Sequence, residues 1–201
     1  MAKVRADQGI WTPANIVTII RVVSLPVWLL IAQLSTPGTD SLSISALLVF
    51  VCYVLISLTD KLDGYLARSR NEVSPFGQFL DPIADKLAVT VALCYLLESG
   101  FTNSWVLLVI LSREFLVSGL RMVVANEGVV VPASNLGKWK TAVTMVSICG
   151  LLMVMALPQG VVADRLHLVF NVGMAAALIL TAWSGVDYFI KCWPYVVGRR
   201  R

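Results

Sequence analysis

The sequence contains few of the residue patterns that zinc, redox or nucleic-acid-binding proteins require. Its cysteines stand singly inside apolar stretches, without the C-x-x-C spacing of zinc and thiol redox sites, so we interpret all four as core residues: Cys52, Cys94, Cys149 and Cys192. The net charge of +4 comes without a basic stripe interleaved with aromatics, which argues against a nucleic-acid partner. Internal repeats and low-complexity segments are also lacking. Nothing therefore marks a second domain, and we expect a single domain over residues 1–201.

Apolar residues, in contrast, are abundant. They make up 58% of the chain and give a mean hydropathy of +0.81, whereas soluble globular proteins have about 45–50% apolar residues. Lipid is therefore the predicted solvent. A membrane-spanning helix needs about 20 apolar residues. The sequence predicts an all-α polytopic membrane protein with six transmembrane helices at about residues 14–34, 42–68, 76–97, 103–125, 137–157 and 163–193.

The ends of the first span carry local signals. Thr12 before Pro13 fits an N-cap followed by a first-turn proline, so we expect the first helix to begin there. The preceding residues, MAKVRADQGIWTP, lack the short apolar core and the small-residue cleavage site of a signal peptide. We therefore expect the first apolar segment to remain as a helix.

Basic residues fall on one side of the six-span path, and Lys and Arg near span ends are retained in the cytoplasm. The opposite loops contain only Arg165. The basic side holds Lys3, Arg5, Arg68, Arg70, Arg121, Lys138, Lys140, Lys191, Arg199, Arg200 and Arg201. We therefore expect both termini in the cytoplasm and an integral protein of a bacterial cytoplasmic membrane. Four tryptophans near predicted span ends fit interfacial anchors: Trp11, Trp105, Trp139 and Trp193.

Four aspartates lie in or at the ends of the second and third spans. A charged side chain at the centre of a membrane helix costs about 2.5–3.5 kcal/mol on insertion scales, so these carboxylates need compensation. Residues three and four apart share a helix face, which puts Asp60 with Asp63 on one stripe and Asp81 with Asp85 on another. A short linker makes the two helices antiparallel neighbours. The four carboxylates then form an all-oxygen site for two divalent cations, Mg²⁺ or Mn²⁺, an arrangement suited to in-line phosphoryl displacement.

Small residues and an arginine share these stripes. Gly64, Ala67 and Gly77 leave room for a flat group or for close backbone approach. Arg68 lies at the inner end of the second span, where its guanidinium can bind phosphate oxygens. The stripes therefore combine a metal site with space for a phosphorylated ligand.

The pattern Asp60-x-x-Asp63-Gly64-x-x-Ala67-Arg68, followed after eight residues by Gly77-x-x-x-Asp81-x-x-x-Asp85, resembles the complete signature of the CDP-alcohol phosphotransferase family. The resemblance implies a six-helix membrane enzyme that moves the phosphatidyl group of CDP-diacylglycerol to an alcohol. It implies a binuclear metal site on the four aspartates and Asp85 as the general base. It assigns donor binding to Gly64, Ala67, Arg68 and Gly77, and by analogy it implies a homodimer.

The first span adds a polar stripe of Asn15, Thr18 and Arg21, spaced three residues apart. In relatives a similar pattern lies near the nucleotide, so the resemblance extends donor binding to Asn15 and Thr18. The alternative is helix packing, with Arg21 snorkelling to the headgroups. Both interpretations stand at the level of sequence.

Cations in the fourth and fifth spans predict a second anion site beside the metals. These are Arg113, Arg121, Lys138 and Lys140. Intramembrane cations mark functional sites, and family members that use glycerol-3-phosphate look similar in both segments, so we expect these residues to bind the acceptor phosphate. An Arg113–Glu114 structural pair and anchoring by the lysines are the alternatives. The expected products are phosphatidylglycerophosphate and CMP.

Other functions remain open on sequence alone. The acceptor can instead be inositol phosphate, serine or phosphatidylglycerol, with the same chemistry. A cation-coupled transporter also holds carboxylates in the membrane, but it does not need Gly, Ala and Arg at these spacings. An intramembrane prenyltransferase binds diphosphate through metal-bridging aspartates, with different spacing and more spans.

Overall fold

Six α-helices form the part of the chain that the computed structural model describes, residues 12–70, 75–126 and 135–196. They are α1 (Pro13–Leu34), α2 (Ile44–Arg70), α3 (Pro75–Glu98), α4 (Ser104–Asn126), α5 (Asn135–Ala156) and α6 (Val161–Val196). These ranges confirm the six predicted helices to within a few residues at most ends. The predicted start of α1 is also confirmed, because the Thr12 side chain accepts a hydrogen bond from the Asn15 backbone N–H and Pro13 occupies the first turn.

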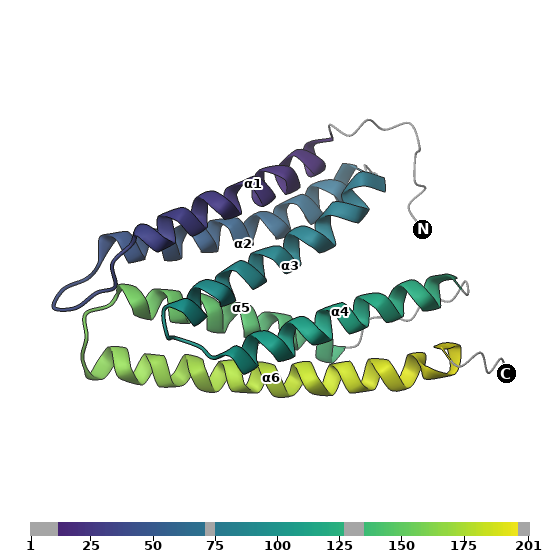
Figure 1. Cartoon of the computed structure of the whole chain (residues 1–201). Coiled ribbons are helices and arrows are strands. Elements are labelled where there is room, and N and C mark those ends of the chain that lie inside the picture. The colour runs from purple at the N-terminus through teal and green to yellow at the C-terminus, as the bar shows by residue number, and fades with distance from the viewer. Residues whose placement is uncertain (1–11, 71–74, 127–134, 197–201) are drawn as a thin grey trace.

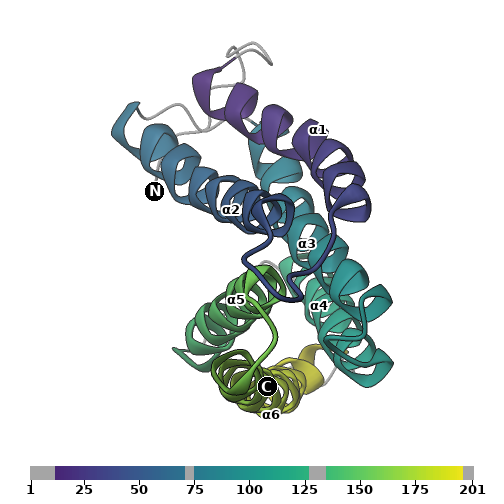
Figure 2. The same ribbon diagram turned by 90° about the vertical axis from the view of Figure 1, so that its left-hand side faces the viewer.

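Consecutive helices run in opposite directions, so the connections alternate between the two ends of the bundle (Figure 1). Residues 35–43, 99–103 and 157–160 form the connections at one end, which we call the loop end. The opposite end, where α1, α3 and α5 begin, is called the polar end. Seen along the bundle, α1, α2 and α3 form one group and α4, α5 and α6 a second (Figure 2). The packing of α2 against α5 joins the groups.

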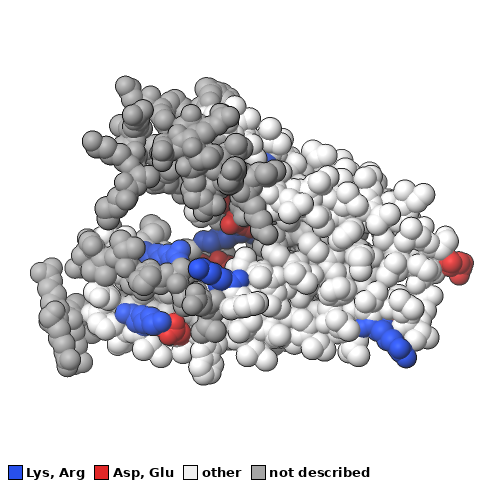
Figure 3. All heavy atoms as spheres, turned by 180° about the vertical axis from the view of Figure 1, so that it is seen from behind, with Lys and Arg blue, Asp and Glu red and all other residues white. Residues whose placement is uncertain are grey.

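The helices expose apolar side chains and bury polar ones, as a lipid-facing protein requires. On α1, Ile20 and Val23 are 60% and 62% exposed, whereas Thr18 and Arg21 are 0% and 2% exposed. The described charged residues gather mainly near the polar end, and most of the remaining surface in view is uncharged (Figure 3). Without water to solvate it, a charged group in lipid has to face the bundle interior. This arrangement explains why a polar stripe on α1 faces inward.

Within the described ranges, three helical segments are long and apolar enough to cross a membrane: Asn15–Leu34, Gly137–Ala156 and Val161–Tyr195. The apolar part of α2, Ile44–Thr59, is shorter. Both α3 and α4 carry several charged residues, which lowers their apolarity although their 24 and 23 residues are enough for a span. Length and composition thus support three of the six predicted spans directly.

The core begins with an aromatic cluster that joins α1, α2 and α3. Trp28 lies 5.3 Å from Tyr53 and 5.7 Å from Tyr95, measured between ring centroids, and its indole N–H donates to the Val49 carbonyl at 2.9 Å. All three rings are buried. The pairing of buried aromatic rings with a satisfied indole N–H stabilises the register of the first three helices. A smaller cluster of Val117, Val124, Tyr188 and Cys192 joins α4 to α6.

Backbone hydrogen bonds fasten two connections together at the loop end. The Gly38 N–H donates to the Met155 carbonyl at 2.9 Å, and the Gln159 N–H donates to the Thr39 carbonyl at 2.7 Å. A Cβ atom at Gly38 would lie 2.4 Å from the Leu157 carbonyl oxygen, so only glycine permits this approach. The connection between α1 and α2 is therefore fixed to the connection between α5 and α6.

One expectation from sequence is wrong. Cys94 is exposed on α3, although we expected all four cysteines in the core. Its neighbours Leu93 and Tyr95 turn toward the core, so position 94 falls on the outward face. Trp105, Trp139 and Trp193, predicted as interfacial anchors, are indeed exposed and lie near helix ends.

Candidate active site

The inward stripe of α1 meets the acidic stripe of α3. The Thr18 hydroxyl donates to Asp81 Oδ1 at 2.9 Å. Arg21 Nη1 lies 3.3 Å from Asp85 Oδ1, and Arg21 Nε donates to the Thr59 hydroxyl on α2 at 3.3 Å. The arginine is buried, whereas 58% of the Asp85 side chain is exposed. Side chains of α1 therefore bind two predicted site residues, Asp81 and Asp85. Both carboxylates remain exposed and accessible to a ligand.

The acidic motif of α2 lies on the last three turns of that helix, where the backbone is helical. The side chains of Asp60, Asp63, Gly64, Ala67 and Arg68 lie outside the described residues. Thr59, which accepts from Arg21, immediately precedes this motif. Because Arg21 contacts both Thr59 and Asp85, the backbone brings the beginning of the α2 motif beside the α3 carboxylates. Gly77 is buried at the beginning of α3.

The carboxylates fit a site for hard divalent cations. Asp81 and Asp85 are exposed and lie one turn apart on α3, and carboxylate oxygens are the ligands that Mg²⁺ and Mn²⁺ prefer. Among the described side chains no group of three His, Cys, Asp or Glu residues comes together. A complete ligand set on this chain therefore needs the α2 carboxylates in addition to the α3 pair.

A large cavity of about 970 Å³ opens between α2, α4, α5 and α6. All four cations predicted to bind the acceptor phosphate line it: Arg113, Arg121, Lys138 and Lys140. The rest of the wall is mainly apolar and includes Phe50, Val54, Met145, Met153 and Phe170. The cavity is thus amphipathic, with cations from α4 and α5 and a few other polar residues on a mainly apolar lining.

A smaller cavity of about 140 Å³ is lined by Asp85 and by residues that also line the large cavity. Arg21, Asp85 and Lys86 line it on one side. Glu114 and Lys140 line both cavities, as do Ser57, Thr141 and Met145. The small cavity beside Asp85 and the large basic cavity therefore share part of their walls.

Glu114 is the centre of a charged network at this wall. Its Oε1 accepts from Arg113 Nη1 at 3.2 Å and from Lys140 Nζ. Lys86 Nζ donates to the Ser118 hydroxyl, which in turn donates to the Glu114 carbonyl at 2.7 Å. The predicted Arg113–Glu114 pair is present, but it is part of a network that also joins α4 to α3 and α5.

Two residues of α6 support the arginines of α4, and sequence reasoning missed both. The Tyr188 hydroxyl accepts from Arg121 Nε at 3.3 Å, and the Arg121 guanidinium carbon lies 5.6 Å from the centre of the Tyr188 ring. A Cβ atom at Gly185 would lie 3.1 Å from Arg113 Cγ. The buried polar series Thr181, Ser184 and Tyr188, at helical spacing on an apolar helix, was the available signal.

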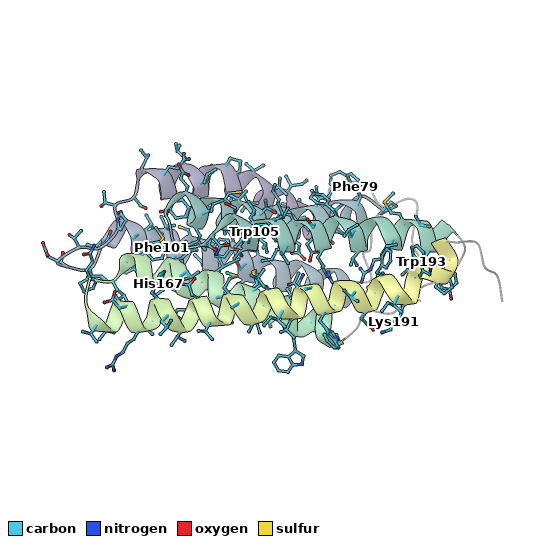
Figure 4. The ribbon with its side chains drawn as sticks, turned by 60° about the horizontal axis from the view of Figure 1, so that its bottom comes forward. Phe79, Phe101, Trp105, His167, Lys191 and Trp193 are labelled. Atoms are coloured by element: carbon cyan, nitrogen blue, oxygen red, sulfur yellow. The ribbon has the colours of Figure 1, made fainter. Side chains whose placement is uncertain are left out.

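Asn15 and His167, two further positions singled out from the sequence, lie in different parts of the bundle. Asn15 is buried one turn before Thr18 on the same inward stripe. His167, the single histidine, stacks edge-on against Phe101 with 5.1 Å between ring centres. It lies toward the loop end, away from Lys191 and Trp193 at the polar end (Figure 4). The histidine therefore lies far from the carboxylates and cations.

Comparison with known proteins shows the family of this chain. The sequence profile of the CDP-alcohol phosphatidyltransferases matches residues 11–193, nearly the whole chain. The chain belongs to the CDP-alcohol phosphatidyltransferase family. As a member of that family it is a transferase enzyme, and its apolar helices make it an integral membrane protein.

Several curated relatives within the CDP-alcohol phosphatidyltransferases are similar over most of their length. The CDP-diacylglycerol–glycerol-3-phosphate 3-phosphatidyltransferase of Bacillus subtilis is 37% identical over 89% of this chain and 94% of its own. The protein of the same name from Rickettsia bellii is 38% identical, over 90% of this chain and 95% of its own. A probable phosphatidylglycerophosphate synthase of Mycobacterium tuberculosis is 39% identical over 94% of this chain and 85% of its own.

Proposed function

We propose that this enzyme transfers the phosphatidyl group of CDP-diacylglycerol to glycerol-3-phosphate, giving phosphatidylglycerophosphate and CMP. The observation that carries the proposal is the shared wall between the α3 carboxylates and a cavity lined by four cations. A phosphorylated acceptor needs cations in addition to those that serve the donor. The names of the relatives from Bacillus subtilis and Rickettsia bellii support the same reaction.

In this proposal Asp60, Asp63, Asp81 and Asp85 hold two divalent cations, Mg²⁺ or Mn²⁺. When bound, the cations neutralise the negative charge that develops on the phosphate oxygens during displacement. Gly64, Ala67, Arg68 and Gly77 bind the CDP part of the donor. Asn15 and Thr18 also contribute to donor binding in this proposal, and the hydrogen bond from Thr18 to Asp81 indicates that Thr18 also orients a carboxylate.

The reaction begins when Asp85 accepts the proton of the primary hydroxyl of glycerol-3-phosphate. The resulting alkoxide attacks the lipid-side phosphorus of the donor, and the bond from that phosphorus to the oxygen of CMP breaks. Arg21 holds Asp85 through one carboxylate oxygen, and Arg68 stabilises the departing phosphate. The cations of the large cavity orient the acceptor by its phosphate end, which is catalysis by positioning and charge neutralisation.

Purified enzyme tests the proposed function directly. CMP release is measured with CDP-diacylglycerol and, in turn, glycerol-3-phosphate, inositol phosphate, inositol, serine and phosphatidylglycerol. We expect efficient CMP release only when glycerol-3-phosphate is the acceptor. Preference for any other acceptor in this panel contradicts the proposed acceptor but leaves the family chemistry intact, and activity with a prenyl diphosphate donor contradicts both.

Replacing any one of Arg113, Arg121, Lys138 or Lys140 by Gln is expected to lower kcat/KM for glycerol-3-phosphate roughly 10- to 100-fold, because each loses a charged hydrogen bond to the phosphate. The damage should appear mainly as a raised acceptor KM, with donor KM unchanged. Lys191→Gln is the matched control, since Lys191 is exposed and paired with Asp187. Unchanged acceptor kinetics in all four variants would show that these residues act only as membrane anchors.

We also propose that all six helices span the membrane, with the polar end and both termini in the cytoplasm. Single cysteines are introduced at Gly100 and Gly160, in the loop end, and at Lys138 and Lys191, near the polar end, on a background without native cysteines. In intact cells an impermeant thiol reagent is expected to label the first two and spare the second two. Labelling at Lys138 but not at Gly100 would reverse the orientation.

A further inference from the structure

Glu114 is a carboxylate among cations near the middle of α4, which we propose spans the membrane. Its Oε1 accepts from Lys140 Nζ and from Arg113 Nη1. Lys86 Nζ donates to the Ser118 hydroxyl, which donates to the backbone carbonyl of Glu114. Only 21% of its side chain is exposed. A carboxylate at such depth is costly and marks a functional position. Charge balance accounts for its presence, but it does not account for its location on the wall between the two cavities.

The location separates this carboxylate from the metal-binding ones. Glu114 comes from α4 and accepts from cations of α4 and α5, whereas Asp81 and Asp85 lie on α3 and meet the Thr18 hydroxyl and the Arg21 guanidinium of α1. It lines both the small cavity beside Asp85 and the large basic cavity. Glu114 therefore contacts the cations proposed to bind the acceptor phosphate, and it also lines the cavity beside Asp85, the proposed base.

Arg113 and Lys140 each keep donors for a ligand while they bond to Glu114. Arg113 Nε is buried and has no hydrogen-bond partner among the described residues. An ammonium has three N–H donors, and Glu114 Oε1 takes one of those on Lys140. Glu114 thus fixes the direction of both side chains without using up their capacity to bind an anion.

We propose that Glu114 is a positioning residue for the acceptor: it holds Arg113 and Lys140 at the wall so that the bound phosphate points the acceptor hydroxyl toward Asp85. This inference rests on the proposed function. The carboxylate itself repels a phosphate, so its contribution is to orientation and not to affinity. Orientation of a reacting group affects turnover directly, because a small misplacement of the hydroxyl removes the near-attack geometry.

The test separates turnover from anion affinity. Glu114→Gln keeps the shape of the side chain and removes its charge. We expect kcat with glycerol-3-phosphate to fall about tenfold, the effect of one charged hydrogen bond. Inhibition by inorganic phosphate should be equal to or stronger than in the unmodified enzyme, because four cations remain and one negative charge is gone. Donor KM should stay within twofold.

Two further variants complete the experiment. Lys140→Gln is expected to weaken inhibition by inorganic phosphate. When both substitutions are combined, Glu114→Gln should lower kcat by less than it does in the unmodified enzyme, because the two residues act together. Glu98→Gln is the matched control, an exposed glutamate at the end of α3 near the loop end. If Glu114→Gln does not fold, Glu114→Asp is used, which keeps the charge but withdraws the carboxylate, with lower kcat and unchanged phosphate inhibition expected.

The outcomes are distinct. Normal kcat in Glu114→Gln, or in Glu114→Asp where that variant replaces it, overturns the inference. Weakened phosphate inhibition in parallel with lost activity also overturns it, because Glu114 would then support the cavity as a whole. If the unmodified enzyme releases CMP with a different acceptor in the panel, the proposed function fails on its own, without reference to Glu114.

Discussion

Asp85→Asn is expected to lower turnover by about 10²–10⁴-fold, the usual contribution of a general base. The amide cannot accept the hydroxyl proton, yet it keeps an oxygen for the bond from Arg21 Nη1 that Asp85 Oδ1 now accepts. Binding of CDP-diacylglycerol should persist, because most of the proposed donor contacts are unchanged. Asp81→Asn and Asp60→Asn should remove metal-dependent activity to a similar degree, because each takes one charge from the proposed binuclear site.

Metal binding can be measured apart from activity. Purified protein is titrated with paramagnetic Mn²⁺, and the fraction of the Mn²⁺ bound to the protein is measured. We expect this fraction to fall in Asp60→Asn and Asp81→Asn. Asp187→Asn is the matched control, since that carboxylate pairs with Lys191 on α6 and lines neither cavity. Ordinary turnover in Asp85→Asn at neutral pH would place the base elsewhere, and normal Mn²⁺ binding in both other variants would contradict the binuclear site.

Arg21→Gln is expected to lower turnover about 100-fold. The guanidinium is buried and joins Thr59 of α2 to Asp85 of α3, so its loss frees the carboxylate from its position. A misplaced base is costly because proton transfer requires hydrogen-bond geometry. Arg21→Lys should be intermediate, since an ammonium keeps the charge but lacks the planar fork that contacts both helices.

Steady-state kinetics with each variant measure this effect, and thermal unfolding in detergent reports whether the fold is retained. Arg165→Gln is the control, because Arg165 is exposed on α6 toward the loop end. Turnover of Arg21→Gln within twofold of the unmodified enzyme would show that α1 only packs against the site. Thr18→Val should have a smaller effect, because it removes one neutral donor to Asp81.

The helices were predictable because their signals are local. Thr12 and Pro13 mark the beginning of α1 through capping and a fixed φ angle, and both act within one turn. The inward stripe of Thr18 and Arg21 also follows from helical periodicity. What periodicity does not provide is the partner across the bundle. The structure places α1 against Asp81 and Asp85, and donor binding by Asn15 and Thr18 stays a prediction.

The basic site shows the same division between local and long-range information. Charge in an apolar segment singled out Arg113, Arg121, Lys138 and Lys140, and the structure brings them to one cavity. The residues that hold them were not recognised, because Tyr188 on α6 and Arg121 on α4 meet only through tertiary packing. Cys94 was misassigned for a related reason: the part of α3 around it is apolar on every side, so the sequence does not show which side faces outward.

The fastening of the loop end determines how the two groups of helices can move. Hydrogen bonds through Gly38, Thr39 and Ser43 tie the first connection to the last turn of α5 and to the residues that follow it. Because the two groups of helices are tied at the loop end, a rotation of one group against the other displaces residues at the polar end most. That end carries Arg121 and Lys138. We therefore expect any separation of the two groups of helices to be largest around these cations and smallest around the aromatic core at Trp28.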